Sequence, residues 1–340
     1  MIEFFHTVRS FIYEYLPKQK SVSENTRISY NTAIELFVTF MREEKKYSAK
    51  QISYMNIDRD LIIEFLDWLE NARRCKAATR NQRLMALRAF FNYAGILDCT
   101  QTALYIDTLN IPLKADDSKV ISYLSESALA ALLKQPDIKK KTELRNLTFM
   151  VLMYDTAARC SELLNMRIRD LKLNCNHPIA YLHGKGGKTR TVPLLDKTVQ
   201  HCKRYLKRFH PNEKSGSEEY LFYTVSHKRH NQMSHDTVAY FLKKYADAAA
   251  LECPEMPEII RPHMIRHTRA MHLYQHDMPL NMIMEYLGHA SIETTRIYAY
   301  ADTEMKRAAL QKIESDNPAK SIQIGIWEED EEMILKLIGR

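Results

Sequence analysis

Glycine and proline are scarce in this sequence, which has 8 Gly and 11 Pro among 340 residues. Because leucine, alanine, methionine and lysine are abundant instead, this scarcity favours helix over sheet and predicts a mainly α fold. Long apolar runs are missing too, since none approaches the ~18 residues that span a bilayer. The N-terminal stretch MIEFFHTVRSF lacks the regions of a signal peptide. We therefore expect a cytoplasmic protein with no membrane partner.

Complete metal and nucleotide motifs are also lacking. The six cysteines include no CxxC pair and are expected to be reduced and structural. His263/His267 and His272/His276 have the i, i+4 spacing of metal ligands on a helix, but no Glu stands beside the first His of either pair and no third ligand is evident. HGKGGKT is not a P-loop, because Leu182 stands where that motif requires Gly. The sequence thus predicts no metal site.

Charge is unevenly distributed along the chain, whose formal net charge is +7. Residues 113–314 carry 31 basic and 23 acidic side chains, so the positive excess lies in this section. A polyanion is the natural partner for such a surface. Charge by itself favours the simpler explanation, solvated surface lysines, so further evidence is required.

Helical periodicity dominates the first part of the chain. SENTRISYNTAIELFVTFMREE and NIDRDLIIEFLDWLE carry apolar residues at three-to-four spacing, and KAATRNQRLMALRAFFNYAG ends at Gly95, which suits a helix C-cap. We predict an all-α domain at 1–112 and a linker at 113–120. A second domain, 121–314, begins with a helix capped by Ser125. Residues 315–340 form a tail with strand-like SIQIGI followed by five consecutive acids.

A basic helix is expected in the first domain at residues 71–90, which hold six basic and no acidic side chains. Lys76, Arg80 and Arg83 follow at i, i+4 and i+7, on one helix face opposite an apolar face. Such a helix suits contacts with DNA phosphates. A solvated helix face is the competing interpretation.

The second domain is predicted to be mostly helical with one small β-hairpin. A long helical stretch, TELRNLTFMVLMYDTAARCSELLNMRIRDL, contains Arg159 among apolar residues, where an ion pair with Glu162 is the structural alternative to a functional role. PIAYLHGKGGKTRTVPLL then alternates as strand, turn and strand, with Lys185 in the turn.

Phosphate chemistry is indicated by the segments that follow. His263 and Arg266 at i, i+3 share a helix face, and an Arg guanidinium is a planar, permanently charged match for phosphate oxygens. His289 comes after a Gly that ends a helix, and Tyr298 follows nine residues later.

Together these motifs resemble the tyrosine recombinase (phage integrase) family in order, spacing and local context, over 121–314. The resemblance lies in Arg159 of ARCSELL, Lys185 of HGKGGKTRTVPL, His263 and Arg266 of HMIRH, His289 of LGH, and Tyr298. The first domain is similar to the family's all-α, SAM-like core-binding domain. One departure is Ala157, where the family often has Gly; at a helix start Ala should be tolerated.

The resemblance implies a role for each matched residue. Tyr298 would attack a DNA phosphate and form a 3′-phosphotyrosyl link. Arg159 and Arg266 would clamp the phosphate oxygens, Lys185 would protonate the leaving 5′-oxygen, and His263 would accept the phenol proton. His289 would hydrogen-bond the phosphate, while Glu162 would orient the network.

The resemblance also implies partners and biology. No metal, ATP or other cofactor would be needed, and the substrate would be double-stranded DNA recombined through a Holliday junction by a synaptic tetramer. The tail, 315–340, would dock on a neighbouring protomer or remain solvated. We expect integration or excision of a mobile element; the alternatives are Xer-type resolution of chromosome or plasmid dimers, a related topoisomerase, and a catalytically silent DNA-binding regulator.

Overall fold

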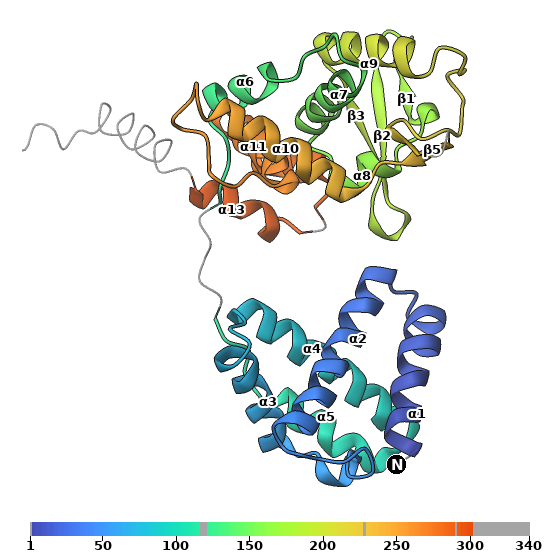
Figure 1. Cartoon of the computed structure of the whole chain (residues 1–340), viewed down its shortest axis with the longest axis vertical. Coiled ribbons are helices and arrows are strands. Elements are labelled where there is room, and N and C mark those ends of the chain that lie inside the picture. Colours follow the sequence, from blue (N-terminus) through green and yellow to red (C-terminus); the bar gives the residue numbers. More distant parts are fainter. Residues whose placement is uncertain (1, 116–120, 227–228, 290, 302–340) are drawn as a thin grey trace, which may run out of the picture. The chain divides into compact units, whose positions relative to one another are not determined.

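The computed structural model describes residues 2–115, 121–226, 229–289 and 291–301, apart from the side chains of 2, 185, 300 and 301. The expected tail, 315–340, and most of the expected linker, 113–120, lie outside this range. The chain divides into two compact units, Met1–Lys119 and Val120–Arg340, each with its own hydrophobic core (Figure 1). No helix within the described ranges is long and apolar enough to cross a lipid bilayer.

The N-terminal unit is helical, as predicted. Its helices bury one apolar face each in a core rich in phenylalanine and leucine. Side-chain caps start two of them: Ser23 accepts from the amide of Thr26, and Asp58 from that of Leu61. The elements are α1 (Ile2–Ser10), η1 (Phe11–Gln19), α2 (Glu24–Glu43), η2 (Tyr54–Asn56), α3 (Arg59–Asn71), α4 (Ala77–Leu97), η3 (Cys99–Gln101) and α5 (Thr102–Leu109).

Gly95 does not end its helix, so that prediction is wrong. Helix α4 continues to Leu97, and Gly95 lies where the helix meets the start of α5. A Cβ atom at Gly95 would be 3.2 Å from Oγ1 of Thr102 and 3.3 Å from its Cα. The glycine therefore permits close approach of two helices and is not a cap.

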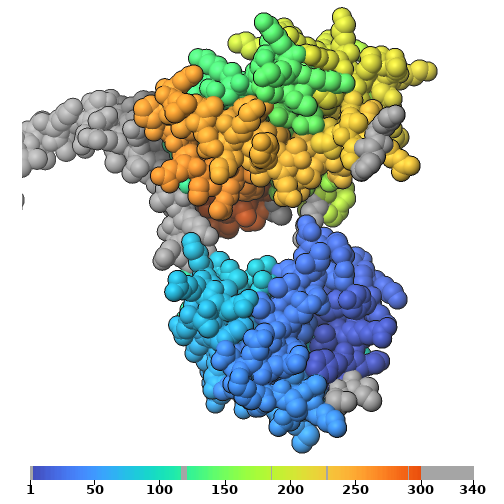
Figure 2. Space-filling model, in the orientation of Figure 1, coloured from blue at the N-terminus to red at the C-terminus, as the bar shows by residue number. Residues whose placement is uncertain are grey.

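The C-terminal unit combines helices with small antiparallel sheets, which confirms the predicted class. The space-filling view shows its elements, green to orange, packed into one continuous body (Figure 2). They are α6 (Glu126–Lys134), α7 (Lys141–Thr156), α8 (Cys160–Asn165), η4 (Ile168–Asp170), β1 (Leu171–Lys172), β2 (Ile179–His183), η5 (Lys185–Gly187), β3 (Thr189–Pro193), α9 (Asp196–Phe209), β4 (Tyr223–Ser226), β5 (Arg229–Gln232), α10 (His235–Ala249), α11 (Pro262–Gln275), α12 (Leu280–Leu287) and α13 (Glu293–Ala301).

The predicted hairpin is present as β2 and β3, which pair in antiparallel register with Ala180 opposite Val192. Strand β1 adds to β2, giving the order β1-β2-β3. The sequence did not indicate β1, which has two residues, or the β4–β5 pair, whose second strand is exposed throughout. Neither has the alternation of buried and exposed side chains that makes a strand recognisable.

The long helix predicted around Arg159 is interrupted. Helix α7 ends at Thr156, and Ala157 is left-handed with φ 48° and ψ 33°. Ala157 is therefore a helix C-cap and not a helix start, so the reason for expecting Ala to be tolerated was wrong. A left-handed alanine costs about 1–2 kcal/mol. This turn sets Arg159 at the N-cap of α8.

Candidate active site

One depression of the C-terminal unit has a strongly cationic lining and a volume of about 460 Å³. Its walls come from the start of α8, the β2–β3 hairpin and the end of α12. The lining residues are Arg159, Gly184, Lys188, Thr189, Arg190, Gly288 and His289. Two of the residues selected from the sequence, Arg159 and His289, thus share one pocket although 130 positions separate them in the chain.

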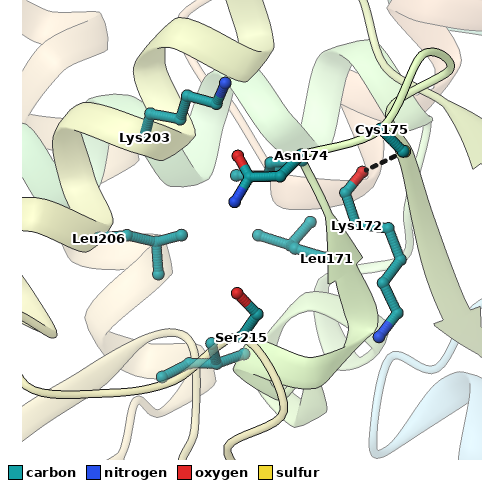
Figure 3. A pocket seen from close by; sticks show the side chains of 9 residues that line it. Leu171, Lys172, Asn174, Cys175, Lys203, Leu206 and Ser215 are labelled. Carbon is teal, nitrogen blue, oxygen red and sulfur yellow. Dashed lines mark hydrogen bonds between the residues drawn. The ribbon is translucent and has the colours of Figure 1, made fainter.

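A second depression, of about 330 Å³, lies between β1 and α9 (Figure 3). Leu171 and Leu206 face each other across it, and the thiol of Cys175 is bonded to the carbonyl oxygen of Lys172 at 3.4 Å. Its apolar walls and the absence of a catalytic constellation among its lining residues make it a poor phosphate site. The cationic pocket is the better match for a phosphate.

A single buried carboxylate organises the arginines of that pocket. Glu162, whose side chain is 2% exposed, accepts from the backbone amide of Arg159 and from its Nη1, each at 2.8 Å. Arg190 donates to the same carboxylate through Nη1 and Nη2, each at 2.9 Å. The Arg159–Glu162 ion pair considered as the structural alternative therefore exists, but the Arg159 side chain remains 38% exposed and lines the pocket.

Arg266 lies behind the pocket on α11 and is 1% exposed. It donates from Nη1 to the carbonyl oxygen of Ala157 at 2.7 Å and from Nη2 to that of Leu287 at 2.6 Å. Burial, followed by the charges of Arg159 and Arg190, lowers the pKa of Arg266 to about 10. It stays protonated at neutral pH and ties the ends of α7 and α12 to α11.

Tyr298 on α13 is fully buried, and its hydroxyl lies 2.9 Å from Nδ1 of His267. Burial raises the pKa of Tyr298 to about 12. Burial, together with His263 and Arg266, lowers the pKa of His267 to about 4. At neutral pH the phenol therefore donates this hydrogen bond and the neutral imidazole accepts it.

His263 was expected to accept the phenol proton, but the hydroxyl of Tyr298 is hydrogen-bonded to His267, one helical turn further along α11. The ring of His263 packs edge-on against His267, with centroids 4.5 Å apart. Burial and the charges of Arg266 and Arg159 lower the pKa of His263, which therefore lies near these two arginines. In the sequence analysis His267 was considered only for its metal-ligand spacing from His263, and it was given no role.

His289 follows Gly288, which ends α12 with φ 63° as predicted. Its Nδ1 lies 2.9 Å from Oγ1 of the buried Thr295, which fixes the orientation of the ring beside the pocket. Burial, then Arg266 and Arg159, lowers the pKa of His289 to about 4. A neutral ring suits a hydrogen-bonding role and not a charged one.

Lys185 begins the tight turn η5 between β2 and β3; its side chain lies outside the described part of the chain. Gly186 and Gly187 both have positive φ, which shapes the turn. The amide of Gly184 donates to the carbonyl oxygen of Lys188 at 2.7 Å and closes the loop. The backbone of Lys185 therefore lies in the turn between two residues that line the pocket, Gly184 and Lys188.

The basic face predicted on α4 is only partly present. Lys76 is exposed at the start of the helix. Arg80 is 5% exposed and donates to the carbonyl oxygen of Pro112 at 3.0 Å, so its placement on an exposed face was wrong. Arg83 is half-buried and donates to the carbonyl oxygen of Ser29. Because α4 packs against α2, α3 and α5, these two arginines hold neighbouring segments together.

Within the ranges that the structure describes, no three or more His, Cys, Asp or Glu side chains are grouped so that they could hold a metal ion. Sequence reasoning missed Arg190 and the contact of His267. A signal for Arg190 existed: it alternates with Val192 on the buried side of β3, opposite Leu182. A charged residue on the apolar face of a strand requires a partner.

Comparison with known proteins agrees with this geometry over both units. The model of the phage integrase family matches residues 122–305, and that of the phage integrase N-terminal SAM-like domain matches residues 11–95. A protein provisionally named integrase/recombinase y4rC, from Sinorhizobium fredii, is 30% identical over 90% of each chain. Tyrosine recombinase XerD of Pseudomonas putida is 27% identical over 88% of this chain and 93% of its own.

Solved structures share the fold. XerH site-specific recombinase is 22% identical, with a TM-score of 0.66 over 92% of this chain and 89% of its own. The integrase of transposon Tn1549 is 16% identical, with a TM-score of 0.67 over 91% and 99%. At this level of identity the likeness concerns the arrangement of the chain.

Proposed function

The chain belongs to the phage integrase family, the tyrosine recombinases, and from this premise we propose that it cleaves and rejoins specific DNA sites through Tyr298. The observation that supports the assignment is that Arg159 and His289 line one cationic pocket, while the buried Arg266 lies close enough for its charge to act on Arg159, His289 and Tyr298. A dispersed set of arginines and a phenol has little use in packing alone, whereas a transferring phosphate needs both.

Each step uses groups of this chain. Tyr298 gives its phenol proton to Nδ1 of the neutral His267, and its oxygen bonds to phosphorus as the bond from phosphorus to the 5′-oxygen breaks. The leaving 5′-oxygen takes a proton from Lys185. Arg159 and Arg266 stabilise charge on the non-bridging oxygens, and His289 donates a further hydrogen bond. Glu162 orients Arg159. The energy of the phosphodiester is retained in the phosphotyrosyl bond, so the reaction requires neither metal nor ATP.

The proposed partners are double-stranded recombination sites and further copies of the chain. XerH was solved bound to its palindromic difH substrate, and the Tn1549 integrase was solved with transposon right end DNA. By analogy the N-terminal unit, 1–112, binds DNA with Lys76 among its contacts, and residues 121–314 perform the chemistry. A synaptic tetramer, with the tail 315–340 docking on a neighbouring copy, completes the proposal, and the reaction takes place in the cytoplasm.

Integration or excision of a mobile element is the biological role that we favour. The y4rC relative, which matches 90% of the chain, carries the integrase/recombinase name. Resolution of chromosome or plasmid dimers is the second candidate, because XerD proteins match both units over nearly their whole length. Mapping the junctions formed in cells separates the two, since integration joins an element to new flanking DNA.

Covalent capture tests the chemistry. The protein is incubated with a pool of nicked duplexes that cover the DNA on either side of its coding sequence, and the products are run on a denaturing gel. A protein–DNA band is expected that persists in EDTA and disappears in Tyr298→Phe. Tyr240→Phe is the control, because it removes the hydroxyl of a tyrosine that is 75% exposed on α10. A band of undiminished strength in Tyr298→Phe would show that another nucleophile acts.

A further inference from the structure

Arg190 is a buried arginine of the pocket for which the reaction above has no role. It lies on β3, opposite Leu182 of β2, and its side chain is 13% exposed. Both of its terminal nitrogens donate to Glu162, at 2.9 Å each, and its Nε is buried without a partner within the described residues. Two parallel bonds to one carboxylate define the direction as well as the distance of the pair.

The partner of Arg190 is also the partner of Arg159. Glu162 takes the Arg159 amide and Nη1 on one side and the Arg190 fork on the other. Burial would raise the pKa of Glu162, but the hydrogen bonds and charge of Arg190, followed by those of Arg159, keep it below its usual value. The carboxylate is therefore ionised at neutral pH and joins the two arginines.

The shared carboxylate of Glu162 connects Arg159, which would hold the phosphate, to the β2–β3 hairpin. Arg159 and Glu162 belong to the first turn of α8, whereas Arg190 belongs to the strand that leaves the turn containing Lys185. The start of the turn also touches the carboxylate, because a Cβ at Gly184 would lie 3.4 Å from Oε1 of Glu162. The paired bonds between Arg190 and Glu162 thus link the hairpin strand directly to the turn that carries Arg159.

A second contact holds Arg190 from the other side. A Cβ at Gly288 would lie 3.1 Å from Cδ of Arg190, so the end of α12, just before His289, packs against the Arg190 stem. Arg190 consequently lies between three parts of the site: the first turn of α8, the hairpin and the residue before His289. None of these contacts requires Arg190 to touch a substrate.

We propose that Arg190 is a positioning residue, whose paired bonds to Glu162 hold the β2–β3 hairpin so that Lys185 is aligned with the leaving 5′-oxygen. This inference rests on the proposed function, in which Lys185 is the general acid. Loss of the pair lets the tip move relative to the phosphate held by Arg159. A displacement of about 1 Å costs on the order of 100-fold in rate.

Replacing the leaving 5′-oxygen by sulfur distinguishes misplacement of the general acid Lys185 from a nonspecific loss of activity. A duplex with a 5′-bridging phosphorothiolate releases a thiolate, which needs no proton, so the general acid becomes unnecessary. First-strand cleavage is measured for wild type, Lys185→Ala and Arg190→Gln on the oxygen and sulfur forms of a duplex recovered by the covalent capture above. We expect Arg190→Gln to slow cleavage of the oxygen substrate roughly 100-fold and that of the sulfur substrate less than about threefold.

Several controls keep the outcome interpretable. Arg204→Gln removes an exposed arginine of α9 and is expected to cleave both substrates like wild type. Arg190→Lys keeps the charge but not the fork, so it should show a smaller version of the same pattern and serves if Arg190→Gln fails to fold. The double variant Glu162→Gln/Arg190→Gln should be no slower than the slower single variant, since both remove one connection.

The two hypotheses fail in different ways. If Lys185→Ala is not rescued by sulfur, the general-acid role in the proposed function is wrong. If Lys185→Ala is rescued but folded Arg190→Gln is equally slow on both substrates, Arg190 does not act through the acid and the present inference is overturned. Unimpaired cleavage of the oxygen substrate by Arg190→Gln would overturn it as well.

Discussion

Acid should destabilise this protein partly through the buried contact between His267 and Tyr298, and one substitution isolates that effect. His267 has its pKa lowered from 6.5 to about 4 in the folded chain, because it is buried near His263 and Arg266. An unfolded chain has neither influence. Between these two pH values the unfolded state binds a proton that the folded state does not, so stability is present above pH 6.5 and is lost as the pH falls.

The size of the loss follows from the width of that window. Each pH unit within it costs about 1.4 kcal/mol for a single site, so lowering the pH from 7 to 5 removes roughly 2 kcal/mol through His267 alone. In His267→Gln the unfolded state has no imidazole at this position to take up a proton, and the amide oxygen of Gln can still accept from the Tyr298 hydroxyl. The variant is therefore less sensitive to acid than wild type, whatever its stability at pH 7.

Urea unfolding followed by circular dichroism at pH 7, 6 and 5 measures the effect. The difference in unfolding free energy between wild type and His267→Gln should change by roughly 2 kcal/mol over this range. His177→Gln, which alters an exposed histidine before β2, is the matched control and should run parallel to wild type. If the curves of His267→Gln and wild type also run parallel, within about 0.5 kcal/mol, the environment described for His267 is incorrect.

Two other predictions follow from the packing. Gly288→Ala places a Cβ at a left-handed position and 3.1 Å from Cδ of Arg190, so it should lower the free energy of unfolding in urea by about 1–2 kcal/mol and slow cleavage. Asparagine tolerates this backbone conformation better, so Gly288→Asn should lose less stability. Equal losses in the two variants would refute the argument. Arg80→Gln should lose about 0.5–1.5 kcal/mol of stability, because the buried guanidinium no longer donates to the carbonyl oxygen of the exposed Pro112, yet keep the salt dependence of DNA binding. Lys76 is exposed, so Lys76→Gln should keep the stability of the protein but lower the salt dependence of DNA binding, the slope of log K against log salt, by about 1. A lower slope in Arg80→Gln would show that Arg80 contacts a phosphate after all.

Local patterns in the sequence were sufficient for much of the fold. Three-to-four periodicity identified α2, α3 and α4 of the N-terminal unit, but not α1, η1 or α5, and alternation identified the β2–β3 hairpin. Ser125 caps α6 as expected, and Gly288 ends α12. These features depend on neighbours within a few residues, so a short stretch of sequence contains the whole physical cause.

Periodicity failed where a second segment decides the outcome. Arg80 occupies the predicted face of its helix, but that face is covered, and the side chain turns to the carbonyl of Pro112. Ala157 looks like one more helical residue, yet it adopts a left-handed turn whose carbonyl binds Arg266. In both cases a contact made by a distant part of the chain outweighs a local preference.

The sequence by itself determined which residue types are available for phosphate chemistry, in what order, and on which kinds of element. Only the tertiary structure decided which of these side chains are in contact. Tyr298 is hydrogen-bonded to His267 and not to His263, and Arg190 shares Glu162 with Arg159. Arg266 and Ala157 are joined across 109 positions. Pairings of this kind depend on how separately formed helices and strands pack, and no local period records that geometry.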